Sequence, residues 1–208
     1  MPNSGAIVRN FNKLWHESGD GTWHRMRWLG VKALKTPTDF WVYQELITAI
    51  KPDCIIETGT CFGGSALFLA TVCQALKKGR VITVDIRLPK DPPMHPKIEY
   101  ITGSSVDPHI IAKVRRRVYG KVLVILDSDH STGHVLKELA AYSQFVTPGS
   151  YMIVEDTSLN GDVRKDHGPG PREAVEAWLP TQNRFEVDRD CERYHLTFNP
   201  GGYLKCVR

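Results

Sequence analysis

Three acidic residues follow directly after two apolar runs of the sequence. Asp127 comes after the run 122–126, and Glu155 and Asp156 come after the run 150–154. Because ligands of open α/β sheets bind at the carboxyl ends of the strands, we expect the three carboxylates to meet there. Their oxygens are hard ligands, which favour Mg²⁺, Ca²⁺ or Mn²⁺ over zinc and copper. The sequence therefore predicts a metal site made by Asp127, Glu155 and Asp156.

The alternative interpretation is a pair of helix caps and an unrelated surface acid. Three uncompensated carboxylates in one cleft would raise one another's pKa, and a divalent ion removes that repulsion. Neighbouring residues of a strand point to opposite faces, so Glu155 and Asp156 can share an ion only if the strand has ended before them. The glycine-bearing loop that follows permits such an end.

A histidine that could move a proton lies three residues after Asp127. The unperturbed pKa of histidine is near neutrality, so His130 is the candidate general base. His134 stands four residues further on, but no third histidine is near, and we assign it a surface or packing role. Asp129 stays ambiguous, because a metal ligand, a helix cap and a partner that orients a histidine all fit it.

A glycine-rich turn between an apolar run and a helical segment is the second chemical feature. The pattern Glu57-x-Gly59-x-x-x-Gly63 differs from the dinucleotide fingerprint GxGxxG and has the spacing of the first motif of S-adenosylmethionine enzymes. Glycines let the backbone approach a ligand closely, and the helix start behind them offers unpaired N–H groups. The turn residues that we assign to the methyl donor are Glu57, Gly59, Thr60, Cys61, Gly63 and Ser65.

Further donor contacts are expected from the neighbouring strand ends. Asp85 ends an apolar run, where an acid can accept hydrogen bonds from both ribose hydroxyl groups; the alternative is a capping or turn aspartate. Ser104 or Ser105 would meet the adenine, although a simple turn accounts for them nearly as well. Ser65 would hold the donor carboxylate or cap its helix. Asp127 would border the donor as well as the metal.

These residues need a parallel sheet to position them. Strands are predicted over 54–58, 81–85, 98–102, 122–126, 150–154, 184–188, 194–198 and 203–207. Helices are predicted before the first strand up to Ile50 and over 64–77, 108–118, 132–145 and 172–179. Alternating strands and helices indicate a parallel sheet covered on both faces, and the last strands indicate an antiparallel edge. The expected fold class is α/β, a Rossmann-like, mostly parallel sheet of seven strands.

Residues 1–208 are expected to form a single domain, with residues 1–35 as an N-terminal extension. This extension contains three tryptophans, which either pack over a domain edge or line a pocket for a flat organic ligand. A short helix within 12–28 is compatible with its sequence. The segment 157–171 is long, contains glycines and prolines and lacks periodicity, as lids often do. We expect both segments to cover the acceptor site.

Composition excludes several classes of protein. With 208 residues, 41% hydrophobic and 24% charged, the chain matches an ordinary soluble domain. Its net charge of +4 is too small to argue for nucleic acid, and the basic run 113–117 is expected on a solvated helix face. No run approaches the ~20 apolar residues that span a membrane. Five cysteines without a CxxC pair indicate free thiols, and with a polar N-terminus they predict a cytoplasmic protein.

Several motifs together resemble one enzyme family. They lie at 28–31, 35–47, 55–59, 63–66, 126–131 and 168–171. From about Trp23 to the C-terminus, this combination resembles the family named for cephalosporin hydroxylase and rhamnosyl O-methyltransferase. A more distant similarity is to catechol O-methyltransferase, from which the chain departs by carrying Asp156 where an asparagine ligand stands and His130 where a lysine base stands.

The resemblance implies a class I, S-adenosylmethionine-dependent O-methyltransferase that uses Mg²⁺ or another hard divalent cation on Asp127, Glu155 and Asp156. The acceptor would be a small molecule with a free hydroxyl group, either a sugar or a natural-product scaffold, and a homo-oligomer is also implied. Asp127 would serve catalysis through the metal, and His130 would take the proton if the metal alone is insufficient. Two alternatives remain: a non-catalytic donor-binding subunit and, less readily for want of a 2-His-1-carboxylate set, a hydroxylase.

Overall fold

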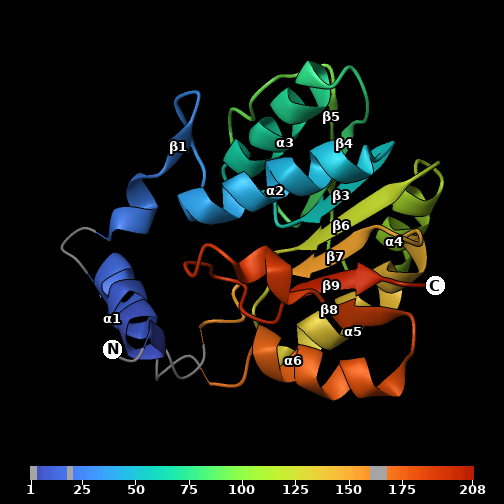
Figure 1. Ribbon diagram of the computed structural model, residues 1–208. Helices are drawn as coiled ribbons and strands as arrows, with labels where there is room; N and C mark the ends of the chain where they lie inside the picture. Colours follow the sequence, from blue (N-terminus) through green and yellow to red (C-terminus); the bar gives the residue numbers. More distant parts are fainter. Residues whose placement is uncertain (1–3, 18–20, 160–167) are drawn as a thin grey trace.

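The computed structural model describes residues 4–17, 21–159 and 168–208, and a sheet of seven strands lies at its centre (Figure 1). The strands are β3 (Cys54–Thr58), β4 (Val81–Asp85), β5 (Ile98–Thr102), β6 (Val122–Leu126), β7 (Tyr151–Val154), β8 (Phe185–Val187) and β9 (Tyr203–Cys206). Their order in space is β5-β4-β3-β6-β7-β9-β8. The strands β5 to β7 run parallel, and β9 is antiparallel to both β7 and β8.

The register brings the carboxyl ends of the central strands level with one another. Thr58 pairs with Val84 on one side and with Leu126 on the other. The chain runs from β3 outward to β4 and β5, and then returns to place β6 on the other side of β3. A crevice forms where the strand order reverses in this way, and it is the usual ligand site of open α/β sheets. The prediction of a seven-stranded, mostly parallel sheet with an antiparallel edge is confirmed.

Helices cover both faces of the sheet, because its strands are apolar on both sides. All five residues of β6 are buried, which requires a layer above and a layer below. One face carries α2 (Pro37–Ile50) and α3 (Gly64–Ala75), and the rings of Phe40 and Phe68 stack there with centroids 4.1 Å apart. The other face carries α4 (Pro108–Arg115), α5 (Thr132–Tyr142) and α6 (Pro171–Trp178). Short 3₁₀ turns lie at Thr22–Arg25, Ser143–Phe145, Leu179–Thr181 and Arg189–Glu192.

The strand predicted at 194–198 is wrong. These residues form turns and an irregular segment instead. His195 has a φ of +65°, which a strand does not allow, and the N–H group of Phe198 donates to Asp39 Oδ2 at 3.0 Å rather than to a neighbouring strand. The alternation of the sequence there does not match burial either, since the apolar Tyr194 is exposed and the polar Thr197 is buried.

The N-terminal region contains more regular structure than its sequence indicates. The helix α1 (Ser4–Glu17) begins eight residues before the segment 12–28 in which a short helix was compatible with the sequence. A two-stranded hairpin follows, formed by β1 (Arg27–Trp28) and β2 (Val31–Lys32). In Figure 1, α1 stands beside the main body. The hairpin β1–β2 forms a sheet of its own, separate from the seven-stranded sheet.

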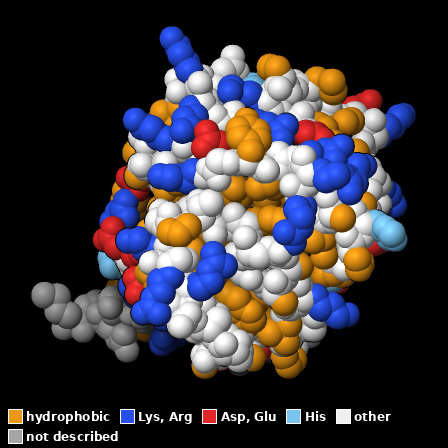
Figure 2. Space-filling model, turned by 90° about the vertical axis from the view of Figure 1, so that its right-hand side faces the viewer, with side chains coloured by type: hydrophobic (Ala, Val, Ile, Leu, Met, Phe, Trp, Pro, Cys, Tyr) orange, Lys and Arg blue, Asp and Glu red, His pale blue; other side chains and the backbone are white. Residues whose placement is uncertain are grey.

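The basic side chains on the surface are distributed as the sequence predicts. Figure 2 shows Lys and Arg side chains scattered over one face, with apolar and uncharged surface between them. The basic run 113–117 lies at α4 as expected, with Arg115 and Arg116 exposed and Val114 buried. All five cysteines are free. Within the described residues, none of the helices has the length and apolarity of a membrane span.

Candidate functional site

Two cavities meet at the carboxyl ends of β3, β4 and β6. The outer cavity, of about 820 Å³, lies between the glycine turn and the segment from Val84 to Pro89. The inner cavity, of about 260 Å³, lies between the same turn and Lys35, His130 and Asp156. The two share one wall, whose residues are Gly59, Cys61, Phe62, Asp127 and Ser128. The two cavities are therefore adjacent along these residues.

The glycine turn depends on a backbone conformation that other residues rarely adopt. Gly59 has a φ of +88°, and a Cβ atom there would lie 1.8 Å from the carbonyl oxygen of Asp127. The backbones of the turn and of the segment after β6 are thus in direct contact. Gly63 also has a positive φ, and α3 starts directly behind it at Gly64. Gly59 therefore allows another backbone segment of the protein itself to approach closely. A close approach of the ligand stays a prediction.

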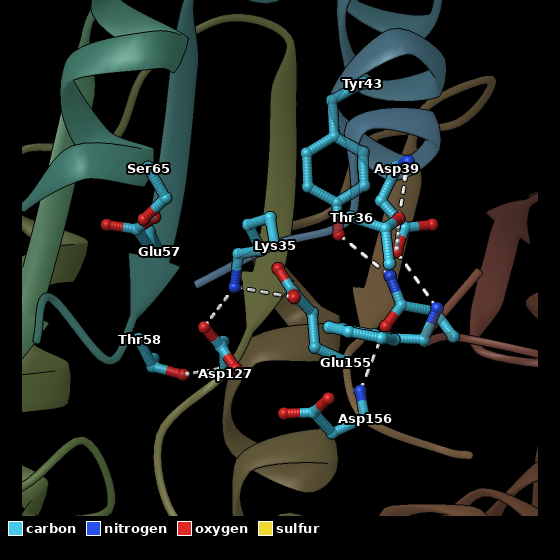
Figure 3. A network of polar contacts seen from close by, with 12 residues as sticks. Lys35, Thr36, Asp39, Tyr43, Glu57, Thr58, Ser65, Asp127, Glu155 and Asp156 are labelled. Atoms are coloured by element: carbon cyan, nitrogen blue, oxygen red, sulfur yellow. Dashed lines mark hydrogen bonds and ion pairs between the residues drawn. The ribbon is translucent and has the colours of Figure 1, made fainter. Parts of the chain in front are cut away.

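Glu57 lies beneath the turn rather than in either cavity. It is 1% exposed, and it accepts hydrogen bonds from Ser65 Oγ at 2.5 Å and from Thr83 Oγ1 at 2.6 Å. Burial raises the pKa of the Glu57 carboxyl to about 7, against the opposing effect of these two hydroxyl donors. Ser65 borders the inner cavity, with Glu57 behind it (Figure 3). Glu57 therefore supports the site from below.

Asp85 joins the ends of two strands. Its Oδ2 accepts the backbone N–H of Cys61 at 2.9 Å, and its Oδ1 accepts that of Arg87 at 3.1 Å. Each carboxylate oxygen retains a lone pair, and the side chain borders the outer cavity. Asp85 is thus placed where the ribose of a donor was expected, with its orientation fixed by the turn itself.

The predicted adenine end contains a polar group that sequence reasoning did not assign to the site. Ser105, and not Ser104, borders the outer cavity. His134 also borders it, and its Nε2 lies 3.0 Å from Ser105 Oγ and 3.1 Å from Ser128 Oγ. The buried Glu138 accepts a hydrogen bond from Ser128 Oγ at 2.7 Å and raises the pKa of His134. His134 is partly buried at this cavity, which its position in the sequence did not indicate.

Two of the three predicted metal acids come together with the predicted base. Asp127, His130 and Asp156 each offer a ligand atom, and these atoms all lie within 4.8 Å of one another. His130 Nε2 is 3.3 Å from Asp156 Oδ2. Strand β7 ends at Val154, so the condition that the strand must have ended before the acid pair is met. Asp156 has a φ of +57°, and its N–H group donates to Asn199 Oδ1 at 2.9 Å.

Glu155 lies on the other side of Asp127, where a lysine meets it. Lys35 Nζ is 2.6 Å from Glu155 Oε2 and donates a hydrogen bond to Asp127 Oδ2 (Figure 3). The second oxygen of Glu155 is buried and has no hydrogen-bond donor within bonding distance among the described residues, although the Tyr43 hydroxyl group lies near it. Lys35 therefore bridges two of the three predicted metal ligands.

The electrostatics of this cluster follow from its burial. Burial opposes the charge of Lys35, but Asp127 and Glu155 outweigh it and hold the pKa of the ammonium group well above its usual range. Burial raises the pKa of Asp127 and of Glu155, and Lys35 counters that rise in both. The lysine is therefore charged, and it is the nearest compensation for the two acids.

The loop that carries Lys35 is anchored through another buried acid. Asp39, in the first turn of α2, is 1% exposed and accepts hydrogen bonds from Thr197 Oγ1 at 2.5 Å and Tyr203 Oη at 2.7 Å. Thr36 Oγ1 donates to the same carboxylate at 2.8 Å. These bonds fix the loop that carries Lys35 against the C-terminal part of the chain.

The inner cavity is completed by residues from the ends of the chain. His16 and Trp23 border it from the N-terminal region, and the rings of His16 and Phe198 are 4.7 Å apart. Trp28 packs instead on Phe68, so one tryptophan packs on the domain and another borders a cavity, while the binding of a flat organic ligand stays a prediction. Of the segment 157–171 predicted as a lid, residues 160–167 lie outside the described part; Leu159 borders the inner cavity.

Fold and site together define a Rossmann-like methyltransferase: a seven-stranded sheet with a glycine turn after its first central strand and acids at the neighbouring strand ends. The chain belongs to the rhamnosyl O-methyltransferase/CmcI family, whose model matches residues 20–207. It is 37% identical over 209 residues to a rhamnosyl O-methyltransferase of Mycobacterium leprae (strain TN), covering 96% of this chain and 90% of the relative. The family predicted from the motifs is thereby confirmed.

Solved structures of CmcI have the same fold. An apo structure superposes with a TM-score of 0.71 at 19% identity, covering 89% of this chain and 77% of that chain. A structure described as Mg–SAM superposes with a TM-score of 0.68 at 19% identity, covering 94% and 84%. At this identity the likeness establishes the arrangement of strands and helices.

Proposed function

We propose that this protein transfers a methyl group from S-adenosylmethionine to a hydroxyl group of a small molecule, with the help of a divalent metal ion. The observation that carries this proposal is the shared wall of the two cavities. It brings the glycine turn and the acid cluster within reach of one another through Asp127. Relatives named rhamnosyl O-methyltransferases, and a CmcI structure with magnesium and S-adenosylmethionine, support this assignment.

In the proposed complex the donor lies along the glycine turn. Asp85 accepts hydrogen bonds from ribose hydroxyl groups, and Ser105 and His134 line the adenine end. Thr60, Cys61 and Ser65 face the methionine end from the inner cavity. Glu57 contributes indirectly, by orienting Ser65. The donor sulfonium group then lies close to Asp127, because that residue borders both cavities.

The residues present fit a hard divalent ion. Asp127 and Asp156 supply carboxylate oxygens, and the buried Oε1 of Glu155 is an oxygen without a hydrogen bond among the described residues. We assign the ion to Asp127 and Asp156, with Glu155 as the third acid. When bound, the ion supplies Lewis acidity that lowers the pKa of an acceptor hydroxyl group.

In this proposal His130 receives the proton of the acceptor. Its ring borders the inner cavity beside Asp156, which orients it. Methyl transfer is an in-line displacement, so holding the acceptor oxygen opposite the donor methyl group accounts for much of the acceleration. Leu159, Phe198 and Trp23 give the cavity an apolar wall that limits access of water. We propose that the described residues of the two segments expected to cover the acceptor, His16, Trp23 and Leu159 among them, close this side.

The acceptor, the assembly and the location are also part of the proposal. The relatives' name points to a rhamnose or a similar sugar on a larger molecule. A homo-oligomer and the cytoplasm are expected, the first from the family and the second from the five free thiols.

The test combines binding with turnover. Calorimetry should detect S-adenosylmethionine binding to the purified protein, and rhamnosides added with Mg²⁺ should release S-adenosylhomocysteine. A chelator should abolish the release while leaving donor binding measurable, because the donor contacts lie mainly in the outer cavity. Absence of donor binding would reject the methyltransferase assignment, and undiminished turnover in chelator would reject the metal.

A further inference from the structure

Lys35 lies between Asp127 and Glu155, two of the three acids that are expected to hold a metal ion. Its Nζ atom is 2.6 Å from Glu155 Oε2 and hydrogen-bonded to Asp127 Oδ2, and its side chain is 4% exposed. An ammonium group this deeply buried cannot exchange its partners for water without leaving the pocket. The two acids therefore already hold one cation, supplied by the chain itself.

A divalent ion and this ammonium group would compete for the same two carboxylates. Two cations that contact one carboxylate repel each other, and the repulsion is strong in a partly buried site. Asp127 belongs to both sets, because it contacts Lys35 and also forms the ligand cluster with His130 and Asp156. A stronger contact of Asp127 with Lys35 therefore weakens metal binding by Asp127, and stronger metal binding weakens the contact with Lys35.

We propose that Lys35 is a resident counter-ion, which competes with the divalent metal for Asp127 and Glu155 and so sets the metal affinity of the site. This inference rests on the proposed metal dependence. It gives Glu155 a partner in each state: Lys35 before the metal binds, and the metal afterwards. Lys35 is a positioning residue in this scheme, since it acts through the two acids.

A pair of lysine variants tests this competition. Lys35→Met and Lys32→Met each remove one ammonium group from the wall of the inner cavity, but Lys32 lies over the ring of Phe62, 4.9 Å from its centroid, rather than against the cluster. Mn²⁺ binding to the full chain is measured by electron paramagnetic resonance of the free ion. Lys35→Met should bind Mn²⁺ about tenfold more tightly than the wild type, because a positive charge has left the ligands. Lys32→Met should bind with nearly wild-type affinity.

Thermal unfolding gives a second measurement. Without metal, Lys35→Met leaves two buried carboxylates without their counter-ion, and its melting temperature should fall. Saturating Mn²⁺ should raise that temperature by more than it does in the wild type, because tighter binding stabilises the folded state more. Equal or weaker Mn²⁺ binding by Lys35→Met, or an equal thermal shift, would overturn the proposal.

A second pair of variants keeps the test decisive if Lys35→Met does not fold. Glu155→Gln is compared with the double variant Lys35→Met/Glu155→Gln, which replaces both partners of the buried pair with neutral groups of similar size. The double variant should bind Mn²⁺ more tightly, and equal or weaker binding overturns the proposal. If the wild type binds Mn²⁺ and no Lys35 variant gains affinity, the counter-ion role alone is rejected. If neither the wild type nor any of the variants binds Mn²⁺, the metal part of the proposed function is rejected as well.

Discussion

The two sides of the shared wall are built in different ways. The outer cavity is built around backbone, namely a glycine turn of one strand–helix unit with Asp85 bonded to two N–H groups beside it, and side chains such as Ser105 and His134 complete it. The inner cavity is formed by side chains from distant parts of the sequence, among them His16, Lys35, Asp156 and Phe198. Backbone geometry is common to any sheet of this kind, whereas side chains change one at a time. The acceptor side can therefore diverge while the donor side stays constant.

The largest effect is expected where the two sides meet. Asp127→Asn removes the charge that both the metal and Lys35 use, and kcat/KM should fall on the order of a thousandfold. Donor affinity measured by calorimetry should change much less, because Asp85 and the turn are untouched. Asp91→Asn, at an exposed acid away from both cavities, is the control. Near-normal turnover by Asp127→Asn would mean that the shared wall is not the reaction centre.

The substitution Gly59→Ala is expected to disrupt the donor side alone. The new methyl group would meet the carbonyl oxygen of Asp127 at 1.8 Å, at a φ of +88°. Strain and overpacking together should lower the free energy of unfolding by about 4 kcal/mol and abolish measurable donor binding. Gly149→Ala is a matched control, with a φ of +77° but open space around it, and should cost about 1 kcal/mol. Denaturant titration of both variants checks the difference, and equal losses would show that backbone contact is unimportant.

The contribution of Glu57, beneath the donor turn, to the free energy of unfolding should depend on pH. The pKa of Glu57 is raised to about 7 in the folded state, so the folded protein binds this proton more tightly than the unfolded chain. The resulting stabilisation is complete below the unfolded pKa of about 4.5 and is lost as pH rises to about 7, on the order of 3 kcal/mol in all. The stability difference between wild type and Glu57→Gln should therefore decline over this window.

Chemical denaturation between about pH 5 and 7.5 measures this decline. Glu186→Gln, which changes an exposed glutamate of β8, is the control and should show a difference that does not vary with pH. A flat difference for Glu57→Gln would mean that the buried carboxyl is ionised throughout the range.

The smallest effect should be confined to the acceptor side. His16→Ala removes a ring that borders the inner cavity and contacts Phe198. We expect the KM for the acceptor to rise a fewfold, about 1 kcal/mol of lost contact, with the KM for the donor unchanged. His109→Ala, at an exposed histidine of α4, serves as the control. A matching rise in the donor KM would contradict the separation of the two sides.

The sequence locates the glycine turn and the acid at the next strand end because their determinants are local. The spacing of Glu57, Gly59 and Gly63 and an acid at the end of the next strand are readable without knowledge of the fold. Asp127 and Asp156 could be placed at the same sheet edge because parallel strands end together. The fold class followed from alternating strands and helices in the same manner.

Other contacts of the site depend on tertiary packing and leave no local signal. Lys35 stands next to a turn and a proline, a context typical of exposed lysines, yet α2 and the C-terminal segment enclose it. The segment 194–198 alternates like a strand, but the Thr197 hydroxyl group and the Phe198 N–H group donate to Asp39. His134 was placed away from the site for want of a third histidine, whereas its actual partners are two serines and a buried glutamate.

The hydrogen bonds of Asp39 tie together parts of the chain that are far apart in the sequence. Thr197 and Tyr203, two of its partners, lie 158 and 164 residues after it. Contacts of such long range close a large loop, which costs conformational entropy before the contact is gained. The glycine turn, in contrast, joins β3 to α3 within one strand–helix unit. The loop that carries Lys35 is therefore ordered only once the chain between Asp39 and Tyr203 has folded.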